Sequence, residues 1–124
     1  MKLSLRRTGL ANDELQSLKD MPRLLILHLC FGLEGETLHF QCGGFHKLKK
    51  LHLDHLLNLN SILVDSGALN SLEYLCLKRL FKLKTIPVGI QHLKNLKLVE
   101  IICMPTEFEE RIVPIAEQQH WILQ

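Results

Sequence analysis

Aromatic residues are scarce in this chain of 124 residues, which contains one Trp, one Tyr and five Phe. Leucine takes their place as by far the commonest residue, so any hydrophobic core has to be built mainly from leucine side chains. An apolar fraction of 47% excludes an intrinsically disordered chain. The length is that of one domain rather than two.

A large excess of charge of either sign is also missing. The formal net charge is +2 and the sequence pI is about 8.4, too mild to indicate a nucleic acid or an anionic membrane as partner. No apolar stretch approaches the ~20 residues that a membrane span requires. The basic residues Lys2, Arg6 and Arg7 are not followed by the apolar run of a secretory signal.

Paired cysteines are absent as well. Cys30, Cys42, Cys76 and Cys103 form no C-x-x-C pair, and the chain has no Asn-x-Ser/Thr acceptor for glycosylation. We therefore expect free thiols in a reducing compartment, which favours a cytoplasmic protein over an extracellular receptor domain.

What the sequence does contain is an internal repeat with a 24-residue period. Apolar-x-apolar pairs begin at positions 3, 27, 51, 75 and 99, and another leucine lies three residues before each of the last four pairs. Further columns agree at the same period, such as the apolar residues Leu38, Ile62 and Ile86. A period of this length that carries L-x-x-L-x-L is the signature of leucine-rich repeats.

Each pair predicts a short strand whose two leucines face a core while the middle residue faces the other side. One unit cannot bury its leucines alone, but stacked units share a continuous core. We therefore predict an α/β fold, a leucine-rich-repeat solenoid of about five 24-residue repeats over residues 1–104. Its strands form a short parallel concave sheet, and its convex side is irregular.

The segments between the strands differ from unit to unit. Residues 12–20 predict a helical turn opened by a capping residue, whereas the glycine-rich residues 32–44 predict a loop. The Asn that commonly follows the strand in such repeats is missing, because that column reads Thr8, Gly32, Leu56, Leu80 and Met104. Residues 105–124 predict a closing segment: a short amphipathic helix over 106–119, interrupted by Pro114, with Trp121 packed on the last repeat.

Two stretches together with the repeats carry a resemblance to a known family. They are Ile86-Pro87-x-Gly89-Ile90-x-x-Leu93-x-x-Leu96 and Met104-Pro105-Thr106-Glu107-Phe108-x-x-Arg111-Ile112. The chain resembles the C-terminal leucine-rich repeats of plant intracellular disease-resistance proteins, in the class with an N-terminal coiled coil and a nucleotide-binding domain. It contains neither a G-x-x-x-x-G-K-[ST] phosphate loop nor coiled-coil heptads. The nucleotide binding of the family is therefore assigned to none of its residues. Because the first repeat begins in mid-strand without a capping unit, we expect a fragment of a longer protein.

The resemblance implies a non-enzymatic protein-recognition module of a plant immune receptor. Such a module senses a pathogen effector or a guarded host protein, and it holds the nucleotide-binding domain of the parent receptor in its off state. We expect no cofactor, no metal and no nucleic-acid partner. The alternative is a stand-alone intracellular leucine-rich-repeat scaffold or adaptor, which the missing Asn column disfavours.

Candidate contact residues follow from the predicted concave face, because solenoids usually bind partners there. They occupy the middle of the predicted strands or the positions beside it, where the alternative is a set of merely solvated strand residues: His28, His52, Asp54, Tyr74, Cys76, Lys78 and Glu100.

Other chemistry is less well supported by the sequence. His28, His52 and Cys76 share one column, with Cys30 and Asp54 nearby, and imidazole and thiolate are zinc ligands, but the 24-residue spacing matches no ligand motif. Cys76 and His52 have the residue types of a nucleophilic dyad without an orienting third group or oxyanion donors. The basic runs 47–50 and 78–84 alternate with core leucines, which indicates the solvated sides of strands and turns.

Overall fold

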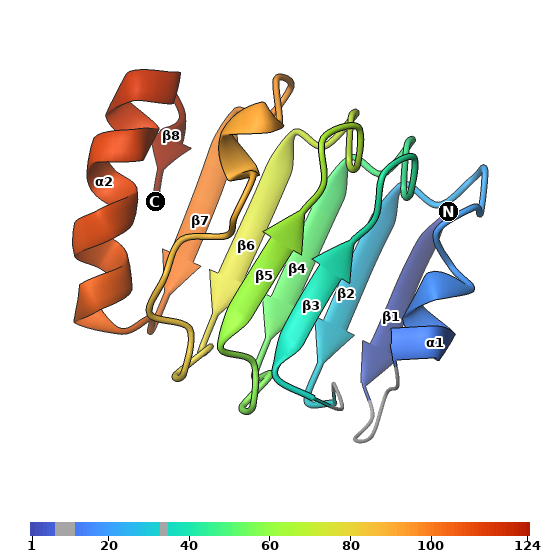
Figure 1. Ribbon diagram of the computed structural model, residues 1–124, viewed down its shortest axis with the longest axis horizontal. Helices are drawn as coiled ribbons and strands as arrows, with labels where there is room; N and C mark the ends of the chain where they lie inside the picture. The colour runs from blue at the N-terminus through green and yellow to red at the C-terminus, as the bar shows by residue number, and fades with distance from the viewer. Residues whose placement is uncertain (7–11, 33–34) are drawn as a thin grey trace.

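The structure of the protein is a computed structural model that describes residues 1–6, 12–32 and 35–124. In this part of the chain, six parallel strands form the main sheet in the order β1-β2-β4-β6-β7-β8. The strands are β1 (Lys2–Arg6), β2 (Ile26–Cys30), β4 (Lys50–Asp54), β6 (Tyr74–Lys78), β7 (Leu98–Ile102) and β8 (Ile122–Leu123). They lie side by side in Figure 1.

The register of this sheet follows the period of the sequence. Leu3 pairs with Leu27, Leu27 with Leu51 and Leu51 with Leu75, each partner exactly one repeat further along the chain. The paired leucines of β2, β4 and β6 are at most 4% exposed. Each buried leucine contributes about 2 kcal/mol through apolar burial. The predicted strands, their parallel pairing and their inward faces are confirmed, and the arrangement is compatible with a leucine-rich-repeat fold.

A second sheet faces the first, and it corrects the prediction that this side is irregular throughout. The strands β3 (Thr37–Phe40) and β5 (Ser61–Val64) pair in parallel, and each residue again meets its counterpart in the next repeat. Both alternate half-buried and buried residues, with Leu38 and Phe40 in one strand and Ile62 and Val64 in the other facing inward. This alternation outweighs the flanking glycines that predicted a loop, because it gives each segment one apolar face to bury.

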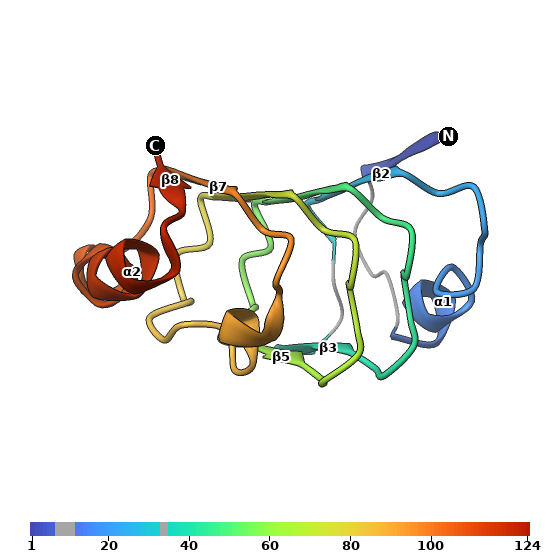
Figure 2. The same cartoon turned by 90° about the horizontal axis from the view of Figure 1, so that it is seen from above.

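Figure 2, seen from above, shows the two sheets facing each other, and the buried side chains of their strands belong to one core cluster. The leucines that precede the strands, Leu24, Leu48, Leu72 and Leu96, are all at most 5% exposed and belong to it, as their column predicted. Helix α1 (Asn12–Gln16) and the 3-10 helix η1 (Ile90–His92) lie in the connecting segments. The helical turn predicted in residues 12–20 is confirmed over α1. Thr8, the first residue at the position where such repeats commonly have Asn, lies outside the described residues. No helix in the described ranges has the length and apolar character needed to cross a membrane.

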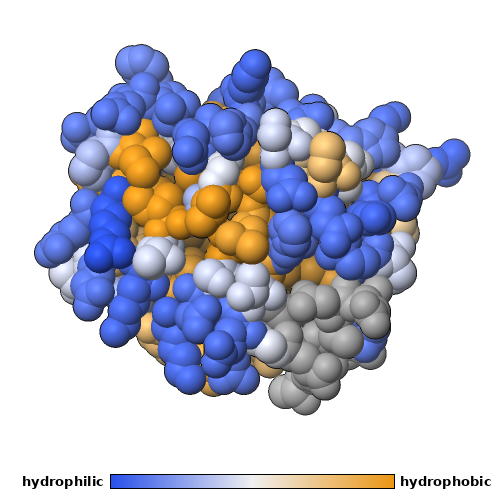
Figure 3. Space-filling model, in the orientation of Figure 1, coloured by the Kyte–Doolittle hydropathy of each residue, from blue (hydrophilic) through white to orange (hydrophobic). Residues whose placement is uncertain are grey.

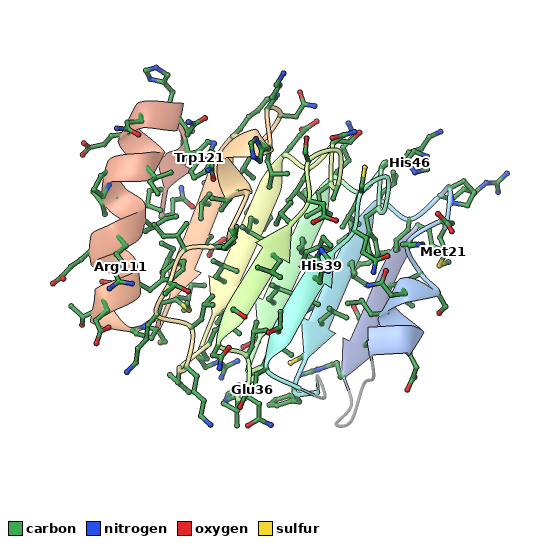
Figure 4. The ribbon with its side chains drawn as sticks, in the orientation of Figure 1. Met21, Glu36, His39, His46, Arg111 and Trp121 are labelled. Carbon is green, nitrogen blue, oxygen red and sulfur yellow. The ribbon has the colours of Figure 1, made fainter. Side chains whose placement is uncertain are left out.

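One end of the main sheet is covered by α2 (Thr106–Gln119) and β8. Phe108, Ile112 and Ala116 form the buried face of α2, and Trp121 is 7% exposed within the same core cluster, next to α2 in Figure 4. The predicted packing of Trp121 is thus confirmed. β8 was not predicted, and it extends the sheet by pairing with β7.

The prediction that Pro114 interrupts this helix is wrong, since α2 runs through it for 14 residues. Proline removes one backbone N–H and so leaves the carbonyl of Glu110 without its partner four residues on. Both residues lie on the exposed side of the helix, where water reaches that carbonyl. The buried face, spaced four residues apart, holds the helix together across the proline.

Pro114→Ala is expected to stabilise the protein by about 1 kcal/mol. The change restores the missing hydrogen bond and removes a poor helix former, while the more flexible unfolded chain offsets part of that gain. Thermal unfolding followed by circular dichroism measures the change. Pro105→Ala is the control, because Pro105 precedes the first helical residue and breaks no intrahelical bond. An unchanged or lower melting temperature for Pro114→Ala would contradict the prediction.

Candidate functional site

A depression of about 240 Å³ lies on the outer face of the main sheet. All seven residues that the sequence singled out line it, together with Leu53 and Ile102: His28, His52, Asp54, Tyr74, Cys76, Lys78 and Glu100. The structure therefore brings the whole predicted set together, from four neighbouring strands.

Strand geometry explains why these residues meet. Residues two apart in a strand share a face, and directly paired residues of neighbouring strands are close together. His28 pairs with His52, which pairs with Cys76, which pairs with Glu100. The His28 and His52 ring centroids are 5.3 Å apart, and those of His52 and Tyr74 are 5.1 Å apart. The floor of the depression is thus a row of rings across three strands.

Two of the seven residues are buried, contrary to the prediction, and the other five are half-buried. Asp54 is 8% exposed and Cys76 is 7% exposed. Arg79 donates a hydrogen bond from Nε to Oδ1 of Asp54 at 3.1 Å and one from Nη2 to Oδ2 at 2.9 Å. Burial is the largest single influence and would raise the pKa of Asp54, but the hydrogen bonds from Arg79 together with the charges of Arg79 and Lys78 outweigh it and hold the pKa below its usual value. Asp54 is therefore an ionised carboxylate whose two oxygens are already hydrogen-bonded to Arg79 within the fold.

The two histidines of the depression have lowered pKa values. Burial is the largest cause for both. For His28 the charges of Arg6 and Lys2 add to it, although Asp54 opposes them. Both imidazoles are consequently neutral at pH 7.

The other end of the depression is held by hydrogen bonds. The hydroxyl of Tyr74 donates to the carboxylate of Glu100 on β7. Burial and this hydrogen bond both raise the pKa of Tyr74. Burial also raises the pKa of the Cys76 thiol. Because the thiolate is the nucleophilic form, this environment disfavours the Cys76–His52 dyad that the residue types suggested.

Candidate metal ligands are grouped differently from the sequence-based hypothesis. The ligand atoms of His28, Cys30 and Asp54 all lie within 4.8 Å of one another, whereas Cys76 is not in this cluster. Both carboxylate oxygens of Asp54 already accept hydrogen bonds from Arg79, and Cys30 Sγ lies 3.9 Å from Oδ2. The guanidinium of Arg79 on this carboxylate disfavours a metal cation at this place.

Sequence reasoning missed the residues that follow the strands. Phe31, His55, Arg79 and Cys103 come directly after β2, β4, β6 and β7, and all have φ between 53° and 69°. Their backbones continue the sheet. The amide of Phe31 donates to the backbone carbonyl of Asp54, and the amide of His55 donates to the backbone carbonyl of Lys78, both at 3.1 Å. The 24-residue period relates these four positions to one another. A left-handed backbone is usually predicted from Gly or Asn, however, and none of the four residues is Gly or Asn.

Among known proteins, the chain is similar to plant disease resistance proteins of Arabidopsis thaliana. It is 30% identical over 110 residues to disease resistance protein RPM1 and 33% identical over 111 residues to a putative disease resistance protein. It is 26% identical over 113 residues to disease resistance protein RPH8A. These matches cover 89–90% of the chain but only 12% of each relative. No protein-family model and no solved structure matches the chain.

Proposed function

This chain is related to a segment of plant disease resistance proteins, and from that premise we propose that it is a non-enzymatic protein-recognition module of a plant immune receptor. The relationship supports a role in defence. In this proposal the module binds another protein, and that partner is a pathogen effector or a guarded host protein. The observation that carries it is the match of about nine tenths of the chain to these relatives.

The repeat architecture is part of the proposal. Five 24-residue units over 1–104 stack as a leucine-rich-repeat solenoid, and the segment 105–124 closes its end. The constant register from β1 to β7 supports this interpretation, as does the shared leucine core. A stack of rigid strands presents a preformed surface to a partner.

Recognition uses the depression on the main sheet. His52, Tyr74, Lys78 and Glu100 are half-buried there and combine a ring, a cation and an anion, a mixture that suits a protein partner. A ligand that binds better when the receptor is open shifts the population away from the off state, in which the repeats hold the nucleotide-binding domain of the parent receptor. The four free thiols support a reducing cytoplasmic setting.

A segment exchange tests this function. The matching segment of the relative named RPM1 is replaced by this chain, and resistance is measured in the plant with a panel of effectors. We expect the exchange to change which effectors trigger resistance, because the exchanged segment carries the recognition surface. His52→Ser with Lys78→Glu should weaken the response roughly tenfold, as expected for a residue at the centre of an interface.

Lys94→Glu is the matched control for charge, since Lys94 is exposed and lies outside the depression. Asp54 is left unchanged because its substitution would disturb the fold. An exchange that leaves effector choice unchanged, or a double variant that responds like the control, would argue against this function. The stand-alone scaffold would then be the better interpretation.

A further inference from the structure

Three aromatic rings form a continuous ridge at the ends of the strands. This aromatic ridge consists of Phe31, His55 and Phe81, in the segments that follow β2, β4 and β6. The rings of Phe31 and His55 stack with centroids 4.9 Å apart, and His55 meets Phe81 edge-on at 6.2 Å. Phe31 is 45% exposed and Phe81 is 51% exposed. The ridge belongs to the lower edge of the molecule in Figure 1, where these strands end.

The backbone explains why these rings leave the core. Phe31 and His55 have φ of 69° and 57°, and their amides are bonded to the next strand. The residues before them are buried, namely Cys30 and Asp54, so the reversed backbone turns the following side chains outward. Leu57, two residues after His55, is 50% exposed at the same edge. Exposed apolar side chains that gather in one patch are a feature of interaction sites.

The charge around the ridge is positive. The guanidinium of Arg6 lies 6.0 Å from the ring centroid of Phe31. Lys82 and Lys84 follow Phe81 and are exposed, and within the described ranges neither forms an ion pair. Asp54 precedes His55 of the ridge, and Arg79 already neutralises its carboxylate. A partner that covers the ridge therefore gains from carboxylates that face these cations.

From this combination we propose that the aromatic ridge and its flanking cations bind an acidic peptide segment of a partner protein, one that carries apolar side chains between its carboxylates. The proposal rests on the protein-recognition function proposed above and assigns that function a second surface and a partner chemistry. Apolar side chains of the segment cover Phe31, His55 and Phe81, while its carboxylates face Arg6, Lys82 and Lys84.

A single-stranded nucleic acid is also anionic, but the ridge fits it less well. Nucleic-acid bases need free ring faces on which to stack. One face of Phe31 is taken by the stacked His55 ring, and Arg6 also lies against the Phe31 ring. His55 is stacked on Phe31 and meets the edge of Phe81, so the rings are already engaged with one another. An apolar side chain can instead pack on the exposed edges of the rings.

The test uses the purified full chain and a short fluorescent peptide in which aspartate and glutamate alternate with leucine and phenylalanine. Fluorescence anisotropy measures its Kd. Phe31→Asn together with Phe81→Ser should weaken binding roughly tenfold or more. Asn suits the left-handed backbone at position 31, so this variant is expected to fold, which circular dichroism checks. Val113→Ala, which trims an exposed apolar residue on α2, is the matched control.

The contribution of charge is tested separately. Lys82→Glu with Lys84→Glu should weaken binding and reduce its dependence on salt, whereas Lys94→Glu with Lys97→Glu changes the net charge equally at exposed positions away from the ridge. Equal Kd values for both pairs would overturn the proposal, as would a ridge variant that binds like Val113→Ala. Tighter binding of single-stranded DNA than of the peptide would overturn it in favour of a nucleic acid.

The two proposals fail in different ways. If the peptide does not bind the chain while the segment exchange still changes effector choice, the ridge assignment is wrong and the recognition function stands. If the exchange has no effect but the peptide binds through the ridge, the chain is a peptide-binding module outside receptor recognition. Variants in the depression, such as His52→Ser, should leave binding of the peptide unchanged.

Discussion

Gly89→Ala is expected to lower the free energy of unfolding by about 3 kcal/mol. Gly89 has φ of 90°, a conformation that costs a residue with a side chain about 1 kcal/mol or more. A Cβ at this position would also overlap the carbonyl oxygen of Val64 and lie 3.1 Å from its carbonyl carbon. Forcing this backbone apart adds about 2 kcal/mol.

The close approach at Gly89 arises from the pairing of β5 with the segment before η1. The amide of Val64 donates to the carbonyl of Val88 at 2.7 Å, and the amide of Val88 donates to Ile62 at 2.8 Å. These bonds fix the two backbones against each other, so neither can yield without losing them. Val88, which precedes Gly89, is 64% exposed, and Figure 3 shows apolar surface on this face of the molecule between β5 and α2.

Urea unfolding of Gly89→Ala and Gly43→Ala measures the effect with a matched control. Gly43 also has a positive φ, of 80°, but a Cβ there would have nothing within 4 Å. Gly43→Ala therefore reports the conformational cost alone, about 1 kcal/mol. The difference between the two variants isolates the contact with Val64. Equal losses would show that the backbone relaxes freely at Gly89.

Asp54→Asn is expected to destabilise the protein by about 2 kcal/mol at pH 7. The carboxylate is largely buried and accepts two hydrogen bonds from Arg79, and charge-assisted bonds of this kind contribute about 1.5–3 kcal/mol. Asn keeps the shape but loses the charge and one of the two acceptors. Arg79→Met should also lower the stability, because it leaves a buried carboxylate without its cation.

The pH dependence distinguishes this pair from ordinary packing. The pKa of Asp54 is lower in the folded protein than in the unfolded chain, so its contribution is fully present above the unfolded value, near 4. It is lost as the pH falls through the folded value. Urea unfolding at pH 7 and at pH 3 should therefore show a smaller difference between wild type and Asp54→Asn at the lower pH.

Asp65→Asn is the control for this experiment. Asp65 also has a lowered pKa, through its hydrogen bond with His39 at 2.8 Å. Its side chain is 43% exposed, however, so solvent screens the interaction and a smaller change is expected. If Asp65→Asn destabilises the protein as much as Asp54→Asn, burial of the Asp54–Arg79 pair is not the source of the effect.

The 24-residue period was enough to predict the structural features that recur in every repeat. The L-x-L pairs predicted β1, β2, β4, β6 and β7, their parallel register and their buried faces, because alternation along a strand is a local property of the chain. The same period placed the seven candidate residues on one face, where they line a single depression. Side-chain hydrogen bonds between neighbouring units follow the same period. Lys49 bonds Glu73 and Thr37 bonds Ser61, and the members of each pair are one repeat apart.

The features that do not repeat depended on partners far along the chain. Asp54 and Cys76 occupy strand positions that the pattern predicts to be exposed, but Asp54 is buried because Arg79, from the segment after the neighbouring strand, bonds its carboxylate. Pro114 is by type a helix breaker, but α2 continues because its apolar face packs on the end of the sheet. In both cases the gain from packing exceeds a local preference that the residue type alone suggests.

By itself, the sequence determined the 24-residue period, the leucine strands, their shared core and the relationship to plant disease resistance proteins. Tertiary structure alone decided the aromatic ridge, the close approach at Gly89 and the added strand β8. The reason is physical: apolar alternation acts within a few residues, whereas a left-handed turn, a backbone contact or an ion pair is fixed only when stacked units hold distant residues together.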